Sequence, residues 1–175
     1  MSTVLTILRV LLSFLSMNEK DIAAIAKIRR THIGRHLFEL NKLYKRTTLE
    51  YIQAHGFPEM TSSHLHLLSQ ISLKNGTGTQ TVIERVGASK QAVSRTVVAC
   101  ESLGYIERVS VSTDRRAFIL RFTPKGLKLM AVASHAISLA ERMFIQRMGK
   151  AKFDALKTQL EQVSEILDLV QVDKE

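Results

Sequence analysis

The sequence predicts a mainly α-helical protein that carries one small β-hairpin. Proline and glycine are sparse, with two and eight among 175 residues, so long helices are expected. Apolar side chains recur at helical spacing near both ends of the chain. One central stretch is instead rich in β-branched and aromatic residues around a polar turn, which is typical of a hairpin.

The first predicted helix is long and covers about 18–54. Asn18 can cap its N-terminus, and Glu19 and Asp21 in the first turn favour the helix dipole. The helix is expected to end at the sequence HGFP, residues 55–58. Its apolar stripe has spacings of mostly three, four or seven residues and consists of Ile22, Ala26, Ile33, Leu37, Leu40, Tyr44 and Tyr51.

Three shorter helices are predicted next. Thr61 can cap the first of them, which contains Leu65, Leu68 and Ile71, and a loop is expected over 74–78. The second short helix covers about 79–86 and ends at a tight turn, Gly87-Ala88. The third begins at a Ser89 cap and ends at Gly104, in the position of a C-terminal glycine stop.

The hairpin and two more helices complete the chain. Strands are predicted over 105–111 and 117–122, with a polar turn between them. Thr123-Pro124 is an N-cap followed by proline at the first helical position, so helices of about 124–148 and 151–171 follow. The order helix, tight turn, helix and hairpin is that of a winged helix-turn-helix.

Charge and cysteine content limit the partners and the compartment. There are 25 Lys and Arg against 16 Asp and Glu, a net charge of +9, which favours a polyanionic partner. Nucleic acid is the usual one, and an anionic membrane surface is the competing interpretation. Cys100 is the single cysteine, so no intrachain disulfide can form, and a cytoplasmic location is expected.

The first residues, MSTVLTILRVLLSFLS, form an apolar run. Arg9 interrupts the run, no small-residue cleavage site follows it, and it is too short to span a bilayer. Two interpretations stay open. The run is an additional helix that pairs across a dimer, or Met17 is the true first residue.

The helix that begins at Ser89 is the strongest candidate for function. Val93, Val97 and Cys100 fall on one face, which is expected to be buried. The opposite face carries cations and short hydrogen-bonding groups, which a helix in the DNA major groove needs to address bases and phosphates. An ordinary solvated helix face is the alternative. The candidate residues are Ser89, Lys90, Gln91, Ser94 and Arg95.

The hairpin tip adds a second candidate site at Asp114, Arg115 and Arg116. One arginine of such a turn suits the minor groove of DNA, while the acid pairs with the other arginine and orders the loop. The alternative is a surface hairpin with a local ion pair. That alternative leaves the second arginine without a role.

Residues 82–130 resemble the MarR (multiple antibiotic resistance regulator) family of transcription factors. The resemblance rests on VIERVGASKQAVSRTVVACESLGYIERV and STDRRAFILRFTPKGLKLM. The family's wing motif, Asp followed by Arg, stands at 114–116, and its strand-to-helix junction, Thr, any residue, Lys and Gly, stands at 123–126. The chain departs from the family pattern at Thr96 and Cys100, where aliphatic residues are usual, and in its apolar N-terminal extension.

The resemblance implies a mainly α fold with a β-hairpin wing, in which a winged helix-turn-helix is joined to a helical dimerisation layer. Four segments are expected: an apolar extension over 1–17, an N-terminal dimerisation helix over 18–58, the DNA-binding domain over 59–123, and C-terminal dimerisation helices over 124–175. The resemblance further implies a homodimeric repressor that binds a pseudo-palindromic operator and is released from it by a small aromatic or lipophilic ligand. The expected partners are therefore double-stranded DNA, a second copy of the chain and this effector, with no membrane.

A ligand pocket, a metal site and a catalytic site have weaker or no support. Tyr44, Phe57, His64 and His66 stand near the junction expected between the dimer helices and the winged domain, where an apolar cleft with a few polar groups suits a ligand. Structural packing explains these four residues equally well. No cofactor, metal site or catalytic motif is predicted, so the protein is not expected to be an enzyme. The alternatives are a redox- or metal-responsive regulator, or a winged module that contacts protein or nucleic acid without operator specificity.

Overall fold

The computed structural model describes residues 18–111 and 114–167, without the side chains of 111 and 114–117. The chain divides between Leu43 and Tyr44 into two compact units. Within the described residues, no helix combines the length and the apolar character needed to cross a membrane. The seven described helices and three strands give the mainly helical class that the sequence predicts.

The first unit begins with helix α2 (Glu19–Thr31), whose predicted cap is confirmed. The side-chain oxygen of Asn18 accepts hydrogen bonds from the backbone nitrogens of Lys20 and Asp21 at 2.9 and 3.1 Å. Asp21 accepts in return from the backbone nitrogen of Asn18 at 3.1 Å. This reciprocal capping box satisfies donors that a helix start otherwise leaves unpaired.

The prediction of one continuous helix over 18–54 is wrong. Helix α2 ends at Thr31, and a new helix, α3 (Ile33–Ala54), begins after His32, whose backbone is extended. The carbonyl oxygen and Nδ1 of His32 both accept from the backbone nitrogen of Arg35, at 3.1 and 3.2 Å. His32 therefore serves as the cap of α3, next to two residues of low helix propensity, Thr31 and Gly34.

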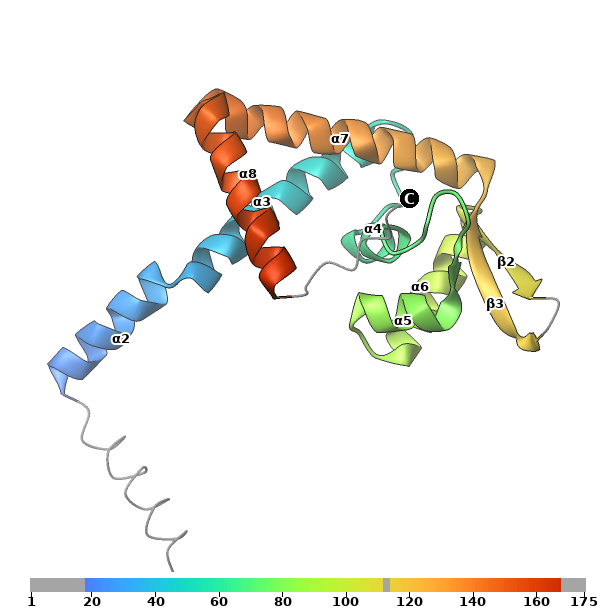
Figure 1. The fold of residues 1–175 in the computed structure, drawn as a ribbon, viewed down its shortest axis with the longest axis horizontal. Coiled ribbons are helices and arrows are strands. Elements are labelled where there is room, and N and C mark those ends of the chain that lie inside the picture. Colours follow the sequence, from blue (N-terminus) through green and yellow to red (C-terminus); the bar gives the residue numbers. More distant parts are fainter. Residues whose placement is uncertain (1–17, 112–113, 168–175) are drawn as a thin grey trace, which may run out of the picture. The chain divides into compact units, whose positions relative to one another are not determined.

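The second unit contains the predicted winged helix-turn-helix (Figure 1). Its helices are α4 (Ser62–Leu68), α5 (Thr79–Val86) and α6 (Lys90–Ser102). The predicted hairpin is β2 (Ile106–Val111) and β3 (Asp114–Phe122), with β3 starting three residues earlier than expected. The predicted caps at Thr61 and Ser89 are confirmed, because each side-chain oxygen accepts a backbone N–H three residues later.

The predicted loop over 74–78 instead contains a short strand, β1 (Thr77–Gly78). It pairs antiparallel with β3, where Thr77 lies opposite Leu120, and gives the sheet order β1-β3-β2. Gly76 has a φ of 72°, and a Cβ there would lie 2.5 Å from the carbonyl oxygen of Leu120. Glycine at this position therefore lets the loop approach β3 closely enough to pair.

Two further helices, α7 (Pro124–Met148) and α8 (Lys150–Ile166), follow the sheet. The ring of Tyr51 in the C-terminal half of α3 stacks on His135 of α7, with ring centroids 5.5 Å apart. The same ring stacks on His55 at 3.7 Å. These contacts attach the end of α3 to α7 within the second unit.

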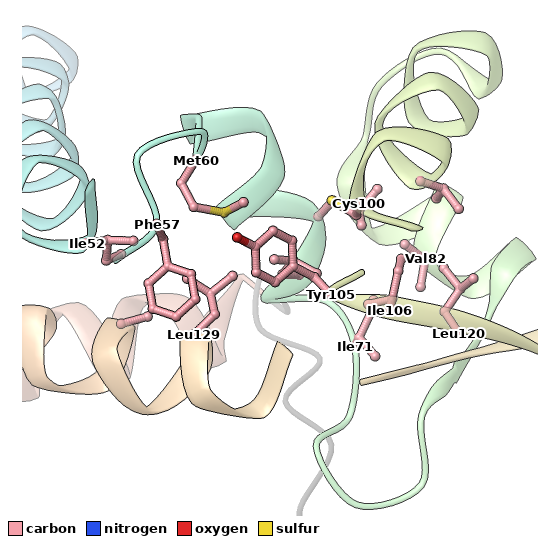
Figure 2. Close-up of a cluster of buried hydrophobic side chains, with 14 of the residues drawn as sticks. Ile52, Phe57, Met60, Ile71, Val82, Cys100, Tyr105, Ile106, Leu120 and Leu129 are labelled. Atoms are coloured by element: carbon pink, nitrogen blue, oxygen red, sulfur yellow. The ribbon is translucent and has the colours of Figure 1, made fainter. Parts of the chain in front are cut away.

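A continuous hydrophobic core lies beneath these elements (Figure 2). Tyr105 is fully buried near its centre, and its ring centroid is 5.9 Å from that of Phe57. Leu129 of α7, Val97 of α6 and Leu120 of β3 are each at most 1% exposed. The core thus joins the first turns of α7 to the winged domain.

The start of α7 lies against the backbone of Tyr105. The hydroxyl of Thr123 caps α7 by accepting from the backbone nitrogen of Gly126 at 3.1 Å, and it donates to the carbonyl oxygen of Gly104 at 2.6 Å. A Cβ at Gly126 would overlap the carbonyl oxygen of Tyr105 and lie 2.9 Å from the carbonyl carbon. The contact between these two backbones therefore requires glycine at 126.

We expect Gly126→Ala to lower the free energy of unfolding by roughly 1–3 kcal/mol, because the new methyl group must displace backbone rather than a flexible side chain. Urea denaturation followed by circular dichroism measures the change. Gly78→Ala is the matched control, since a Cβ there has its nearest neighbour at 3.8 Å. Equal stability of the Gly126→Ala variant and wild type would show that the two backbones are not held in contact.

Candidate nucleic-acid interface

Helix α6 presents two distinct faces. Val93, Val97 and Cys100 are between 0 and 2% exposed, as the sequence predicts, and they pack into the core. The side chain of Ser89 caps the helix by accepting from the backbone nitrogen of Ala92 at 3.3 Å. Burial and capping together fix which side of α6 faces solvent.

The solvent face of α6 gathers the predicted DNA-binding residues. All of them are exposed, and no acidic residue stands in the first turn of the helix. The one acid of α6 is the half-buried Glu101, whose carboxylate pairs with Arg108 of β2 at 3.1 Å. The N-terminal half of this face is therefore cationic and rich in hydrogen-bonding groups. Its members are Ser89, Lys90, Gln91, Ser94 and Arg95.

The turn between α5 and α6 is held in place by a residue from α4. Gly87 ends α5 in the left-handed conformation, with a φ of 66°, as its predicted role in the turn requires. Nε2 of His66 donates a hydrogen bond to the carbonyl oxygen of Val86 at 3.3 Å. This bond satisfies one of the carbonyl groups that a helix end leaves unpaired.

The backbone of the hairpin has the geometry of a wing. Strands β2 and β3 are antiparallel, with Val109 opposite Ile119, and their register shifts between Ser110 and Val111. The predicted wing residues Asp114, Arg115 and Arg116 begin β3, and their side chains lie outside the described part of the structure. Their contact with DNA stays a prediction.

A polar junction that the sequence analysis missed lies at the C-terminal end of α6. The hydroxyl of Tyr105 donates to Glu59, which precedes α4, and Nζ of Lys125 in α7 lies 3.8 Å from the same Glu59 oxygen. Lys125 also donates to the carbonyl oxygen of Leu103 at 2.8 Å and lies 4.5 Å from the centroid of the Tyr105 ring. We call Glu59, Tyr105 and Lys125 the junction triad.

The pKa values at the junction triad move in opposite directions. The hydrogen bond from Tyr105 holds the pKa of Glu59 below its usual value, and a backbone hydrogen bond and Lys125 contribute to the lowering. Burial, followed by the contact with Glu59, raises the pKa of Tyr105. Glu59 therefore stays ionised and Tyr105 stays protonated near neutral pH, which is the state that their hydrogen bond needs.

The four predicted pocket residues lie in different surroundings. Phe57 is buried in the core beside Tyr105, and His64 is half-buried within electrostatic reach of Glu59. His66 is exposed and bonds to the end of α5, whereas Tyr44 is half-buried within electrostatic range of Glu141 in α7. Burial and the nearby Glu141 raise the pKa of Tyr44. Phe57 packs in the core and His66 bonds to backbone, whereas Nδ1 of His64 is buried without a hydrogen-bond partner among the described residues. That the four residues share a ligand stays a prediction.

The single cysteine is poorly placed for chemistry. Cys100 is fully buried, and burial raises the pKa of its thiol to about 12. A thiol of that pKa is protonated at neutral pH and is a weak nucleophile. Across residues 18–111 and 114–167, His, Cys, Asp and Glu side chains do not form any group of three that could hold a metal ion.

Residues 59–117 match the model of the MarR family, which contains α4, α5, α6 and most of the hairpin. An uncharacterized HTH-type transcriptional regulator of Bacillus subtilis (strain 168), YhjH, is 24% identical to this chain over 87 residues. That similarity spans half of this chain and half the length of YhjH.

Solved structures share the fold over a longer stretch. A crystal structure of MarR has 16% sequence identity and a TM-score of 0.69, over 80% of this chain and 100% of MarR. A mutant MarR from E. coli complexed with operator DNA has 16% identity and a TM-score of 0.64, over 78% and 96% of the two chains. PcaV from Streptomyces coelicolor, in complex with its natural ligand, has 21% identity and a TM-score of 0.56, over 78% and 94%.

We expect Glu59→Gln to make the free energy of unfolding less dependent on pH in the acidic range. Because the pKa of folded Glu59 lies below 4.5, its ionised form stabilises the fold above that pH, and this stabilisation is lost as pH falls through the folded pKa. Wild type should therefore lose unfolding free energy faster than Glu59→Gln below pH 4.5, as measured by urea denaturation at several pH values. The exposed Glu107, changed to Gln, is the control and should follow wild type. Parallel profiles for Glu59→Gln and wild type would contradict the role of the triad.

Proposed function

We propose that this chain, a member of the MarR family through residues 59–117, is a homodimeric transcription regulator that binds a specific pseudo-palindromic operator and represses transcription. One observation carries the proposal. A capped helix, fixed by its buried face, exposes arginine, lysine, glutamine and serine next to a β-hairpin. These side chains are the ones that address base edges and phosphates in the major groove.

We assign base recognition to Gln91 and Arg95. They stand four residues apart on the exposed face, so they project from the same side of α6. Arginine pairs with the acceptors of guanine, and glutamine pairs with adenine. Lys90 and Ser94 supply further phosphate or base contacts, and the N-terminus of the helix itself attracts phosphate. The complex of mutant MarR with operator DNA supports DNA binding, though no individual residue, by analogy of fold.

The wing supplies contacts outside the major groove. Arg115 reaches the minor groove, while Asp114 and Arg116 pair and order the hairpin tip. The register of β2 and β3 supports this role, because it carries all three residues at the end of the hairpin.

Apolar surface on helices at both ends of the chain supports a homodimer. In the first unit, side chains of α2 and α3 that would suit a core are 44–76% exposed. Helix α8 exposes Leu156, Leu160 and Val163 at a four-three spacing, which is the pattern of a helix-packing seam. Helices that bury so little within one chain gain stability by pairing with a second copy. The exposed residues in the first unit are Ile22, Ile25, Ile28, Ile33, Leu37, Phe38 and Leu40.

A small aromatic or lipophilic effector is proposed to relieve DNA binding. The complex of PcaV with its natural ligand supports the presence of a ligand site by analogy of fold. Tyr44, Phe57, His64 and His66 are the candidate contacts. His66 offers a physical route, because its bond to Val86 holds the turn before α6, and a ligand that engages the imidazole competes for that bond.

We expect Gln91→Ala and Arg95→Ala each to weaken binding to the selected operator by roughly 1–3 kcal/mol and binding to random duplex much less. Fluorescence anisotropy with both duplexes at several salt concentrations, together with thermal melting, separates the roles. Arg142→Ala is the control, since this exposed arginine lies on α7. Unchanged melting with equal losses on both duplexes would mean that the two residues contact only phosphate, and base reading would pass to Ser94 and Lys90. Binding without any sequence preference would instead favour a general nucleic-acid or protein-contact module.

We expect Leu37→Asp and Leu160→Asp to shift the chain from dimer to monomer, because each places a charge in an apolar interface. Sedimentation velocity at micromolar concentration measures the change. Leu73→Asp is the matched control, since Leu73 is 50% exposed in the winged domain. Wild type that sediments as a monomer, or variants that stay dimeric, would contradict pairing through these helices.

We expect at least one member of a panel of aromatic acids and hydrophobic drugs to raise the melting temperature and to weaken operator binding. Preferential binding to the folded state raises the melting temperature by mass action. His66→Ala should reduce the effect on operator binding. A panel that changes neither property would remove ligand control from the proposal.

A further inference from the structure

Val98 lies in the middle of the exposed face of α6. It follows Gln91 by seven residues, Ser94 by four and Arg95 by three, and these spacings place all four side chains on one side of a helix. Val98 is 51% exposed, whereas Val93 and Val97 on the opposite face are 2% and 1% exposed. Val98 is not among the residues predicted from the sequence for this face, which are all polar or cationic.

Valine at position 98 does not contribute to the stability of the fold. β-Branched residues have lower helix propensity than alanine, lysine or glutamate, and an exposed side chain contributes little to a core. Single exposed apolar residues are common, so exposure alone decides nothing. What distinguishes Val98 is its surroundings, because the side chains beside it on α6 are the ones assigned to DNA.

We propose that Val98 is a specificity-determining residue that contacts the C5-methyl group of a thymine in the major groove. The inference rests on the proposed function and extends it to one base. Seven residues advance a helix by about 10 Å, at about 1.5 Å per residue. That length equals about three base-pair steps of about 3.4 Å. The thymine therefore lies within about three base pairs of the base that Gln91 addresses.

The chemistry of the groove selects this partner. Base edges in the major groove offer hydrogen-bond donors and acceptors, and the thymine methyl is the one apolar group among them. Phosphate offers nothing to an aliphatic side chain. A protein partner would need a broader apolar patch, but the exposed neighbours of Val98 on α6 are Gln91, Ser94, Arg95 and Ser102. Glu101, one turn further along α6, forms an ion pair with Arg108. This pairing reduces the repulsion between Glu101 and DNA phosphates.

The test removes single methyl groups from DNA. Wild type first selects its preferred sites from a random duplex library, and each thymine of the selected site is then replaced in turn by deoxyuridine, which lacks only the C5-methyl. Binding is measured for wild type, Val98→Ala and a control, Leu127→Ala, whose side chain is 46% exposed on α7. Thermal melting checks that Val98→Ala folds, as expected for an exposed position.

We expect deoxyuridine at one symmetry-related thymine position to weaken wild-type binding about fourfold per methyl, the effect of one buried apolar carbon. Val98→Ala should abolish this penalty while Leu127→Ala keeps it. A selected site at which no deoxyuridine weakens wild type, or at which Val98→Ala keeps the full penalty, overturns the inference and leaves the proposed function standing. A library from which no sequence is enriched overturns both.

Discussion

The placement of α6 depends on one short junction at its C-terminal end. Lys125 donates to the carbonyl oxygen of Leu103, and Thr123 donates to that of Gly104, so α7 provides donors for the carbonyl groups at the end of α6. The carbonyl oxygen of Tyr105 lies so close to Gly126 that a Cβ at this position would overlap it. The cation of Lys125 also stands where the dipole of α6 is negative. The Thr-x-Lys-Gly sequence is therefore a structural connection between α6 and α7.

This connection allows one helix to serve both packing and the proposed DNA recognition. Burial of Val93 and Val97 contributes roughly 1.5–3 kcal/mol for each side chain and fixes the rotation of α6 about its axis. The Ser89 cap fixes the start of the helix, and the junction fixes its end. The exposed face is then presented rigidly, so the proposed contacts of Arg95 and Gln91 with base edges would require little loss of backbone freedom on binding.

The features that the sequence predicted are mostly local. The caps at Asn18, Thr61, Ser89 and Thr123 depend on contacts within three residues and are all present. The junction triad was missed because Glu59 and Tyr105 are 46 residues apart, and only the fold brings them together. Strand β1 was missed for the same reason, since its partner in β3 is distant in sequence. The break at His32 was missed because an apolar stripe continues across it and hides a change in backbone conformation.

Charge and apolar surface carry different information about this chain. The net charge of +9 is spread along the sequence and indicates a class of partner without locating the contact. The exposed apolar side chains show which part of the chain needs a packing partner, because no side chain among residues 18–43 is buried. Helix α2 has 13 residues, a length at which an isolated helix is marginal in water. Burial by a second copy would make the order of this unit depend on protein concentration. Folding of the N-terminal helices, dimerisation and the two-fold presentation of α6 to a pseudo-palindrome would then be one linked equilibrium.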